Sequence, residues 1–153
     1  AEITDHRLIY VTPTLKTDVH ISGTPRVTVK LAADKPAANL SVYLVSLPWE
    51  SGRQTVITDN LITRGWADPQ NAKSIRKSEP LKPGEFVTVS FDLMPDDQII
   101  RAGQQIGLMI FSSDKEFTLQ PEPGTQVTVD LGGTMITLPV VGGSAALKAA
   151  LEE

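Results

Sequence analysis

The sequence contains no cysteine and only two histidines, His6 and His20. Without cysteine the chain can form no disulfide, no thiolate metal site and no cysteine nucleophile. Neither histidine has the sequence spacing of a metal-binding pair, and His20 alternates with Val19 and Ile21, so we expect it to face water. Composition therefore excludes disulfide-stapled folds and thiolate chemistry.

Long hydrophobic runs and basic clusters are also missing. No apolar run approaches the ~20 residues that a bilayer-spanning helix needs. Positive charges never exceed two in a row, at Arg76 and Lys77, and the net charge is −4. Since nucleic-acid phosphates and anionic lipid surfaces both require a basic face, we predict no nucleic-acid partner and no membrane partner.

The nucleophile motif of serine hydrolases, G-x-S-x-G, is absent. The nearest string, Gly142-Gly143-Ser144-Ala145-Ala146, lacks the second glycine. We interpret Ser144 as the N-terminal cap of a short helix, because serine oxygens commonly accept the free N–H groups there. We therefore predict no catalytic residue and no enzymatic activity in this chain alone.

The sequence does contain a period-two alternation of apolar and polar residues along most of its length. It is clearest at 19–21, 27–31 and 40–44, where one face would be buried and the other wet. Tyr43 points away from Val42 and Leu44 in this pattern. Further strands are predicted at 56–58, 61–66, 86–93, 105–112, 127–131 and 135–140. Eleven glycines and eleven prolines mark the turns, so we predict an all-β jelly-roll sandwich of about nine strands over residues 1–143.

Two segments break the alternation. Residues 68–79 are polar without a period and predict a long surface loop. Residues 144–153 are rich in alanine and leucine and predict a short helical or disordered tail.

Carboxylates are scattered, with one acidic group near the turn at 93–95. Asp92, Asp96 and Asp97 supply the oxygens that Ca²⁺ prefers, but not in the spacing of a calcium loop. We predict no cofactor and no metal site, with Ca²⁺ at these three residues as the alternative to test.

Seven short strings, taken in order, resemble one known family. They are 8–13 (LIYVTP), 18–25 (DVHISGTP), 38–45 (ANLSVYLV), 61–66 (LITRGW), 80–85 (PLKPGE), 100–106 (IRAGQQI) and 111–114 (FSSD). The set resembles the C-terminal, non-catalytic domain of the X-Pro dipeptidyl-peptidase and cocaine esterase family, most of all its secreted bacterial Xaa-Pro dipeptidyl-peptidases.

The resemblance implies a galactose-binding-like jelly-roll that follows an α/β-hydrolase domain in a longer chain. It implies that the Ser-Asp-His triad lies in that other domain, which would be the partner of this one. It also implies a secreted, extracellular parent protein, whose signal peptide would lie upstream of this chain.

Six residues are candidates for an interdomain or ligand surface. Tyr10, Trp49 and Phe117 have no obvious place in the alternating core, Trp66 joins them if Gly65 turns it outward, and Arg64 and Arg101 are expected at the rim. At least two of the four aromatics are expected to be substantially exposed. Arg64 is expected to stack on Trp66, to hold a carboxylate, or to remain solvated.

Three functions remain open at this point. The chain is an accessory domain that stabilises a serine peptidase and shapes substrate access. Alternatively, it is a free-standing carbohydrate- or ligand-binding sandwich that uses Trp66 as a stacking platform. The third alternative is a structural domain that forms a homo-oligomer through its exposed apolar patch.

Overall fold

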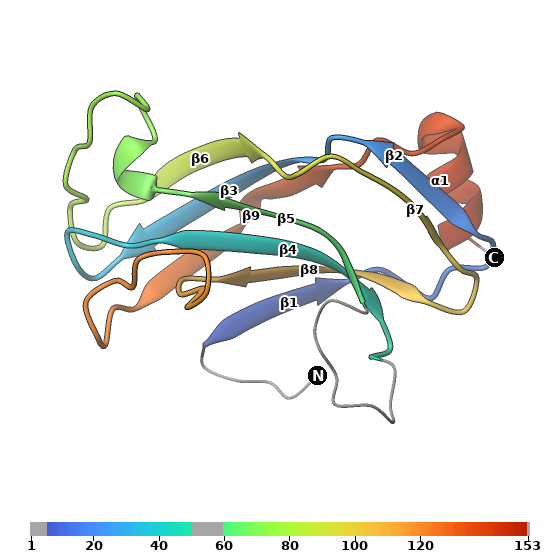
Figure 1. The fold of residues 1–153 in the computed structure, drawn as a ribbon, viewed down its shortest axis with the longest axis horizontal. Coiled ribbons are helices and arrows are strands. Elements are labelled where there is room, and N and C mark those ends of the chain that lie inside the picture. Colours follow the sequence, from blue (N-terminus) through green and yellow to red (C-terminus); the bar gives the residue numbers. More distant parts are fainter. Residues whose placement is uncertain (1–5, 50–59, 153) are drawn as a thin grey trace.

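The structure, a computed structural model, describes residues 6–49 and 60–152 of the chain. Within them lie nine strands, a short 3-10 turn and one helix (Figure 1). The strands are β1 (Arg7–Val11), β2 (Val19–Gly23), β3 (Arg26–Ala33), β4 (Leu40–Leu47), β5 (Leu61–Ala67), β6 (Val87–Asp92), β7 (Asp96–Ile100), β8 (Gln105–Phe111) and β9 (Val127–Thr137). The 3-10 turn η2 spans Pro69–Asn71 and the helix α1 spans Gly143–Leu151. No helix in these residues is long and apolar enough to cross a bilayer.

The strands form two packed layers. One is a four-stranded antiparallel sheet in the order β1-β8-β4-β5, and the other is a three-stranded sheet in the order β6-β3-β9. The β2–β7 pair continues the β3–β6 pair with its register shifted by one residue. The prediction of an all-β sandwich is confirmed, whereas its finer description as a galactose-binding-like jelly-roll stays a prediction.

The main core lies between the two layers, as the alternation predicts. Val27, Val29 and Leu31 of β3 point inward toward Val42 and Leu44 of β4, and all are 0–1% exposed. Because each inward position comes from every second residue, period two in the sequence becomes one buried face per strand.

Strand β9 is one continuous element, whereas the sequence predicted two strands separated by a turn at Gly132-Gly133. The register against β3 shifts at this point, so several residues of β9 lie opposite Val29. Thr134 accepts a hydrogen bond from the Lys30 amide and donates one to the Asp130 carbonyl, which closes the bulge. The glycines thus form a β-bulge, a second common use of glycine within strands.

Helix α1 packs against the sandwich near β2. Ala150 is fully buried in the main core, and its carbonyl accepts a hydrogen bond from the Lys16 amide at 2.8 Å. The prediction that Ser144 caps the helix is wrong. The N-cap is Gly142, whose φ of 85° turns the chain into the helix before Ser144 is reached.

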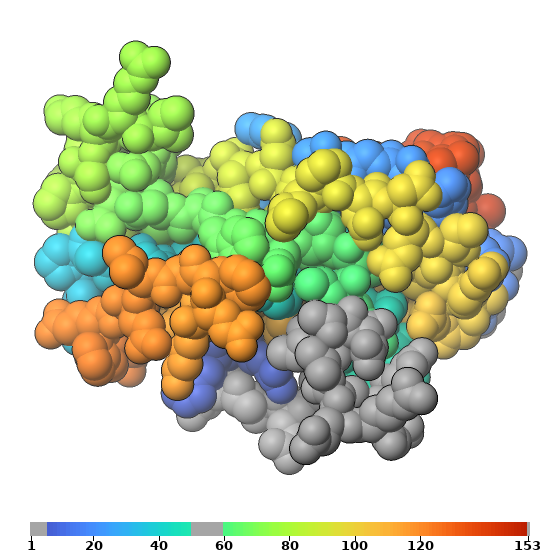
Figure 2. All heavy atoms as spheres, in the orientation of Figure 1, coloured from blue at the N-terminus to red at the C-terminus, as the bar shows by residue number. Residues whose placement is uncertain are grey.

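The polar segment 68–79, predicted as a surface loop, protrudes from the sandwich, in light green at the upper left of Figure 2. Its base is the η2 turn, capped by Asp68, which accepts a hydrogen bond from the Gln70 amide. The predicted strand at 56–58 and the flanking residues 50–59 lie outside the described part of the chain.

Gly65 is the point at which β5 approaches the turn after β6. A Cβ built on it would lie 2.9 Å from Leu93 Cδ2 and 3.2 Å from both the Leu93 Cα and the Asp92 carbonyl oxygen. Two of these three contacts are backbone atoms, which cannot rotate away. Gly65 therefore brings β5 against the opposite layer without a side chain between them.

We expect Gly65→Ala to lower the free energy of unfolding by about 1–3 kcal/mol, because overpacking displaces backbone. Urea denaturation at neutral pH measures it. Gly132→Ala is the matched control, since its Cβ would meet only Asp130 Oδ1 at 3.4 Å. Equal stability of the two variants would show that the close approach at Gly65 is not a constraint.

Candidate functional site

The outer face of the four-stranded sheet, which points away from the main core, carries a second apolar cluster. All eight residues of β4 are buried, although antiparallel strands in sandwiches usually expose one face to water. On the outer face Tyr43, Val45 and Leu47 pack with Met109 of β8. The prediction that Tyr43 points away from Val42 and Leu44 is confirmed, but the side it points to is apolar too.

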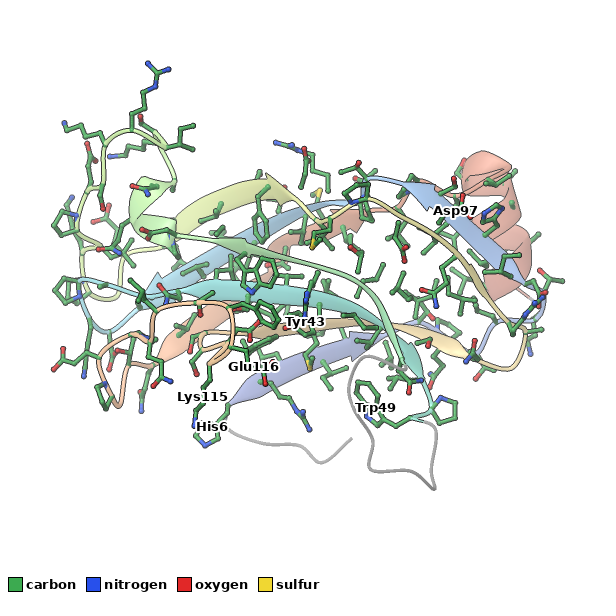
Figure 3. All side chains as sticks on the ribbon, in the orientation of Figure 1. His6, Tyr43, Trp49, Asp97, Lys115 and Glu116 are labelled. Carbon is green, nitrogen blue, oxygen red and sulfur yellow. The ribbon has the colours of Figure 1, made fainter. Side chains whose placement is uncertain are left out.

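The strand register extends this cluster across the whole sheet. One row runs Ile9, Met109, Tyr43 and Arg64, from β1 through β8 and β4 to β5; the next runs Arg7, Phe111, Ser41 and Trp66. Partly buried Ile9, Trp49, Leu61 and Phe111 also pack on the cluster. In Figure 3 Tyr43 lies near the middle of the molecule and Trp49 lies lower, near the end of β4. We call the side chains of these two rows and this cluster the outer face.

Arg64 lies among aromatic rings on this face. Its guanidinium carbon is 4.0 Å from the Phe117 ring centroid, 5.3 Å from that of Trp66 and 5.7 Å from that of Tyr43. Phe117 belongs to the segment after β8, in orange in Figure 2, and its ring centroid is 5.4 Å from that of Trp66. Of the three alternatives expected for Arg64, the structure shows stacking on Trp66.

A buried carboxylate holds the segment after β8 in place. Asp114 Oδ2 accepts hydrogen bonds from the Tyr43 hydroxyl at 2.5 Å and from Trp66 Nε1 at 2.9 Å. Asp114 is 7% exposed, and its carbonyl accepts from the Thr118 amide and hydroxyl. Because bonds to an ionised acceptor are about twice as strong as neutral ones, Asp114 fixes Phe117 above the sheet.

The same carboxylate perturbs Tyr43. Burial, and then the hydrogen bond to Asp114, raises the pKa of Tyr43 to about 12, while the neighbouring Arg64 acts in the opposite direction. Tyr43 therefore stays protonated and remains a donor to Asp114 throughout the physiological range.

The six candidate surface residues do not form one site. Arg64, Trp66 and Phe117 are together on the outer face, and Trp49 packs at its edge. Arg101 lies after β7 and pairs with Asp18 at 2.7 Å. Tyr10 points to the other side of β1, where it lines an apolar groove of about 410 Å³ between β1 and β9.

The prediction that at least two of the four aromatics are substantially exposed is wrong. Phe117 is exposed at 49%, whereas Tyr10, Trp49 and Trp66 are half-buried. Trp66 is covered because Arg64 and Phe117 stack on it and Asp114 binds its ring nitrogen. The exposed large apolar side chains include Met94 (52%) and Leu119 (89%), which the sequence did not single out.

A serine, a histidine and an aspartate do meet on the β2–β7 pair, but not as a catalytic triad. The Asp97 carboxylate accepts from the Ser22 hydroxyl at 2.7 Å and bonds His20 Nε2 at 2.9 Å, and these bonds lower the pKa of Asp97. In a triad the histidine stands between serine and carboxylate, so that it can take the hydroxyl proton. Here the carboxylate stands in the middle, and His20 is held rather than free in water.

Asp92, another of the acidic candidates, has a partner of its own. Asp92 pairs with Arg26 at 2.7 Å on a different strand pair from Asp97. Within residues 6–49 and 60–152, no three His, Asp or Glu side chains are grouped closely enough to hold a metal ion.

Fold and site together define a class: a β-sandwich domain with an apolar, arginine-containing outer face. Residues 1–148 match the family described as the X-Pro dipeptidyl-peptidase C-terminal non-catalytic domain. The chain belongs to this family, as the resemblance predicted, and the domain is non-catalytic.

Two bacterial proteins illustrate the relationship. The chain is 62% identical over 148 residues to the "Putative Xaa-Pro dipeptidyl-peptidase" of Rhodopirellula baltica, across 97% of this chain and 24% of that protein. It is 40% identical over 136 residues to the protein of the same name from Bacillus cereus, across 89% and 22%. The chain thus spans about a quarter of the length of these relatives.

Solved structures share the fold. An alpha-amino acid ester hydrolase superposes with a TM-score of 0.71 at 18% identity, over 89% of this chain and 26% of that one. An aminopeptidase from a marine sediment archaeon, Thaumarchaeota archaeon, gives 0.73 at 15% identity, over 92% and 26%.

We predict that the stability of the chain falls as the pH rises from about 10 to about 12. In this window the folded chain keeps the Tyr43 proton and the unfolded chain has lost it, so the unfolded state binds fewer protons. Below about pH 10 this contribution is fully present. Urea denaturation across the window measures the slope.

Tyr43→Phe should reduce this alkaline loss of stability. Tyr10→Phe is the control and should reduce it less, because burial alone raises the pKa of Tyr10, whereas at Tyr43 the hydrogen bond to Asp114 adds to burial. If Tyr43→Phe leaves the slope unchanged, the pKa of Tyr43 is not raised in the folded chain.

We also predict that chelation leaves stability unchanged, because Asp92 and Asp97 are already bound to Arg26, His20 and Ser22. An ion that binds only the folded state would raise the melting temperature with its concentration. A fall of more than about 5 °C in EDTA would reveal a structural ion. Added Ca²⁺ should then restore it.

Proposed function

We propose that this chain is the C-terminal accessory domain of a serine-type Xaa-Pro dipeptidyl-peptidase and that it docks on the α/β-hydrolase domain of the same polypeptide. The hydrolase domain would remove Xaa-Pro dipeptides from peptide N-termini. The accessory domain would hold it in shape and border the entry of substrate.

The outer face carries this proposal. A two-layer sandwich needs only its inner faces for a core, yet this sheet has apolar side chains on both. Exposed Phe117 and half-buried Trp66 add to the outer side. The four cluster residues are themselves only 0–8% exposed, so a partner would meet exposed Phe117 with half-buried Ile9, Trp49, Trp66 and Phe111 around it. Apolar side chains gathered in this way are typical of a face that another protein covers.

The comparisons support the occupant that we propose. The relatives are about four times as long as this chain, and they are named as dipeptidyl-peptidases while this part of them is named non-catalytic. Interfaces between domains of one chain bury about 600–1,500 Å² and are more polar than obligate ones. Arg64 amid the rings of the outer face is in keeping with that composition.

The carbohydrate-binding alternative is not favoured by any contact. A sugar ring needs an uncovered aromatic face, and the Trp66 ring is already stacked by Arg64 and Phe117. A homo-oligomer through the same face remains an outcome of the test below. Secretion of the parent stays a prediction, which fractionation of the producing bacterium would check.

The test uses the full-length parent protein with a specific protease site introduced ahead of residue 1. After cleavage, we expect the two parts to co-elute in size-exclusion chromatography and to keep hydrolysing an Xaa-Pro-nitroanilide. The present chain alone should hydrolyse none. Phe117→Ser should separate the two parts, because Phe117 is the exposed aromatic residue of the outer face.

Phe86→Ser is the matched control. Like Phe117, Phe86 is about half exposed (45%) and has a cation over its ring, Lys30, but it lies beside the other layer. It should leave the parts together. If the wild-type parts separate on cleavage, or the present chain elutes as a dimer that Phe117→Ser dissolves, the docking proposal fails.

A further inference from the structure

Arg64 is an oriented cation without a carboxylate partner in the described part of the chain. Arg26 pairs with Asp92 and Arg101 with Asp18, each at 2.7 Å, whereas no carboxylate oxygen of a described residue lies within 4.0 Å of the Arg64 guanidinium. The nearest buried acid, Asp114, is committed to Tyr43 and Trp66.

The rings around Arg64 restrict how it can bind anything else. The Arg64 guanidinium carbon lies 4.0 Å from the centre of the Phe117 ring, and the group also interacts with the Tyr43 side chain. Because a guanidinium carries five N–H donors, N–H groups remain for a further acceptor. Those N–H groups form a fixed fork, which matches the two oxygens of a carboxylate better than any other side-chain acceptor. Tyr43 and Trp66 limit the side chain further, so little freedom would be lost on binding.

We propose that Arg64 is the charged centre of the docking face and receives an Asp or Glu carboxylate from the hydrolase domain of the parent protein. This inference rests on the proposed function. Charge complementarity supports it, because a half-buried arginine that a partner covers without an anion would lose water and gain nothing. The apolar side chains around it would exclude water from the pair.

Asp114 acts here as a positioning residue. Through Tyr43 and Trp66 it holds both rings, and through the Thr118 hydrogen bonds it holds the turn that carries Phe117. The aromatic walls of the arginine site are thus assembled before the partner arrives. The partner supplies only the anion.

The protease-cleavable parent tests this proposal. For the wild type, we expect the dissociation constant of the two cleaved parts to rise with NaCl, because a partly exposed ion pair is screened. Arg64→Met should raise it roughly 30-fold or more at low salt, the loss expected when one partner of a covered charge pair is removed. It should also flatten the salt dependence. Arg26→Met is the matched control and should do neither.

The acid itself can be identified chemically. Arg64→Lys places a primary amine at the same position, and a zero-length carbodiimide joins an amine to a carboxylate in contact with it. We expect mass spectrometry to find one cross-link from position 64 to an Asp or Glu of the hydrolase domain. Reversal of charge at that acid, combined with Arg64→Glu, should restore the association.

The outcomes separate this inference from the proposed function. Suppose that the wild-type parts stay together and that Phe117→Ser separates them, but Arg64→Met does not. The docking proposal would then stand, and the proposed carboxylate partner of Arg64 would be refuted. A cross-link from position 64 to a second copy of this chain would also overturn it. Thermal unfolding of each variant guards against misfolding, and Arg64→Lys, which keeps the charge, gives a second reading if Arg64→Met is unstable.

Discussion

Strand β4 is buried on both faces, and the arrangement of the rest of the molecule follows from this. Its backbone is hydrogen-bonded to β5 on one side and β8 on the other. Its inward side chains, such as Val42 and Leu44, make the core with the second layer. Its outward side chains, such as Tyr43 and Val45, need a second cover, and part of that cover is the turn held by Asp114.

The inner half of this arrangement was predictable and the outer half was only partly so. The period-two alternation identifies which residues share a face. It predicted the inward set, and it gives Arg64 and Trp66 the same face of β5. It does not say that a face with Tyr43, Val45 and Leu47 is covered, because apolar residues occur on both phases of β4. A run that is apolar on both phases is itself the signal for a strand covered twice.

Contacts between distant segments escaped prediction. The sequence gives no local reason for Asp114 to reach Tyr43 and Trp66, because the turn after β8 must first fold back over the sheet. Strand β7 begins with Asp96 and Asp97, residues that are rare in strands, and was not among the predicted strands. Its acidic start is stabilised by neighbours on β2, where His20 and Ser22 bind Asp97, the residue labelled in Figure 3.

The pairing of β1 with β8, and of β3 with β9, joins segments separated by most of the chain. Neither sheet can close until such distant segments meet, and the entropy of closing these long loops is lost before any ladder bond repays it. The domain is therefore a slow folder by topology, on the scale of milliseconds to seconds rather than microseconds. During that interval the unpaired strands, apolar on one or both faces, are exposed to other unfolded chains. The time spent incompletely folded, more than the final stability, sets how much of the domain is lost to aggregation.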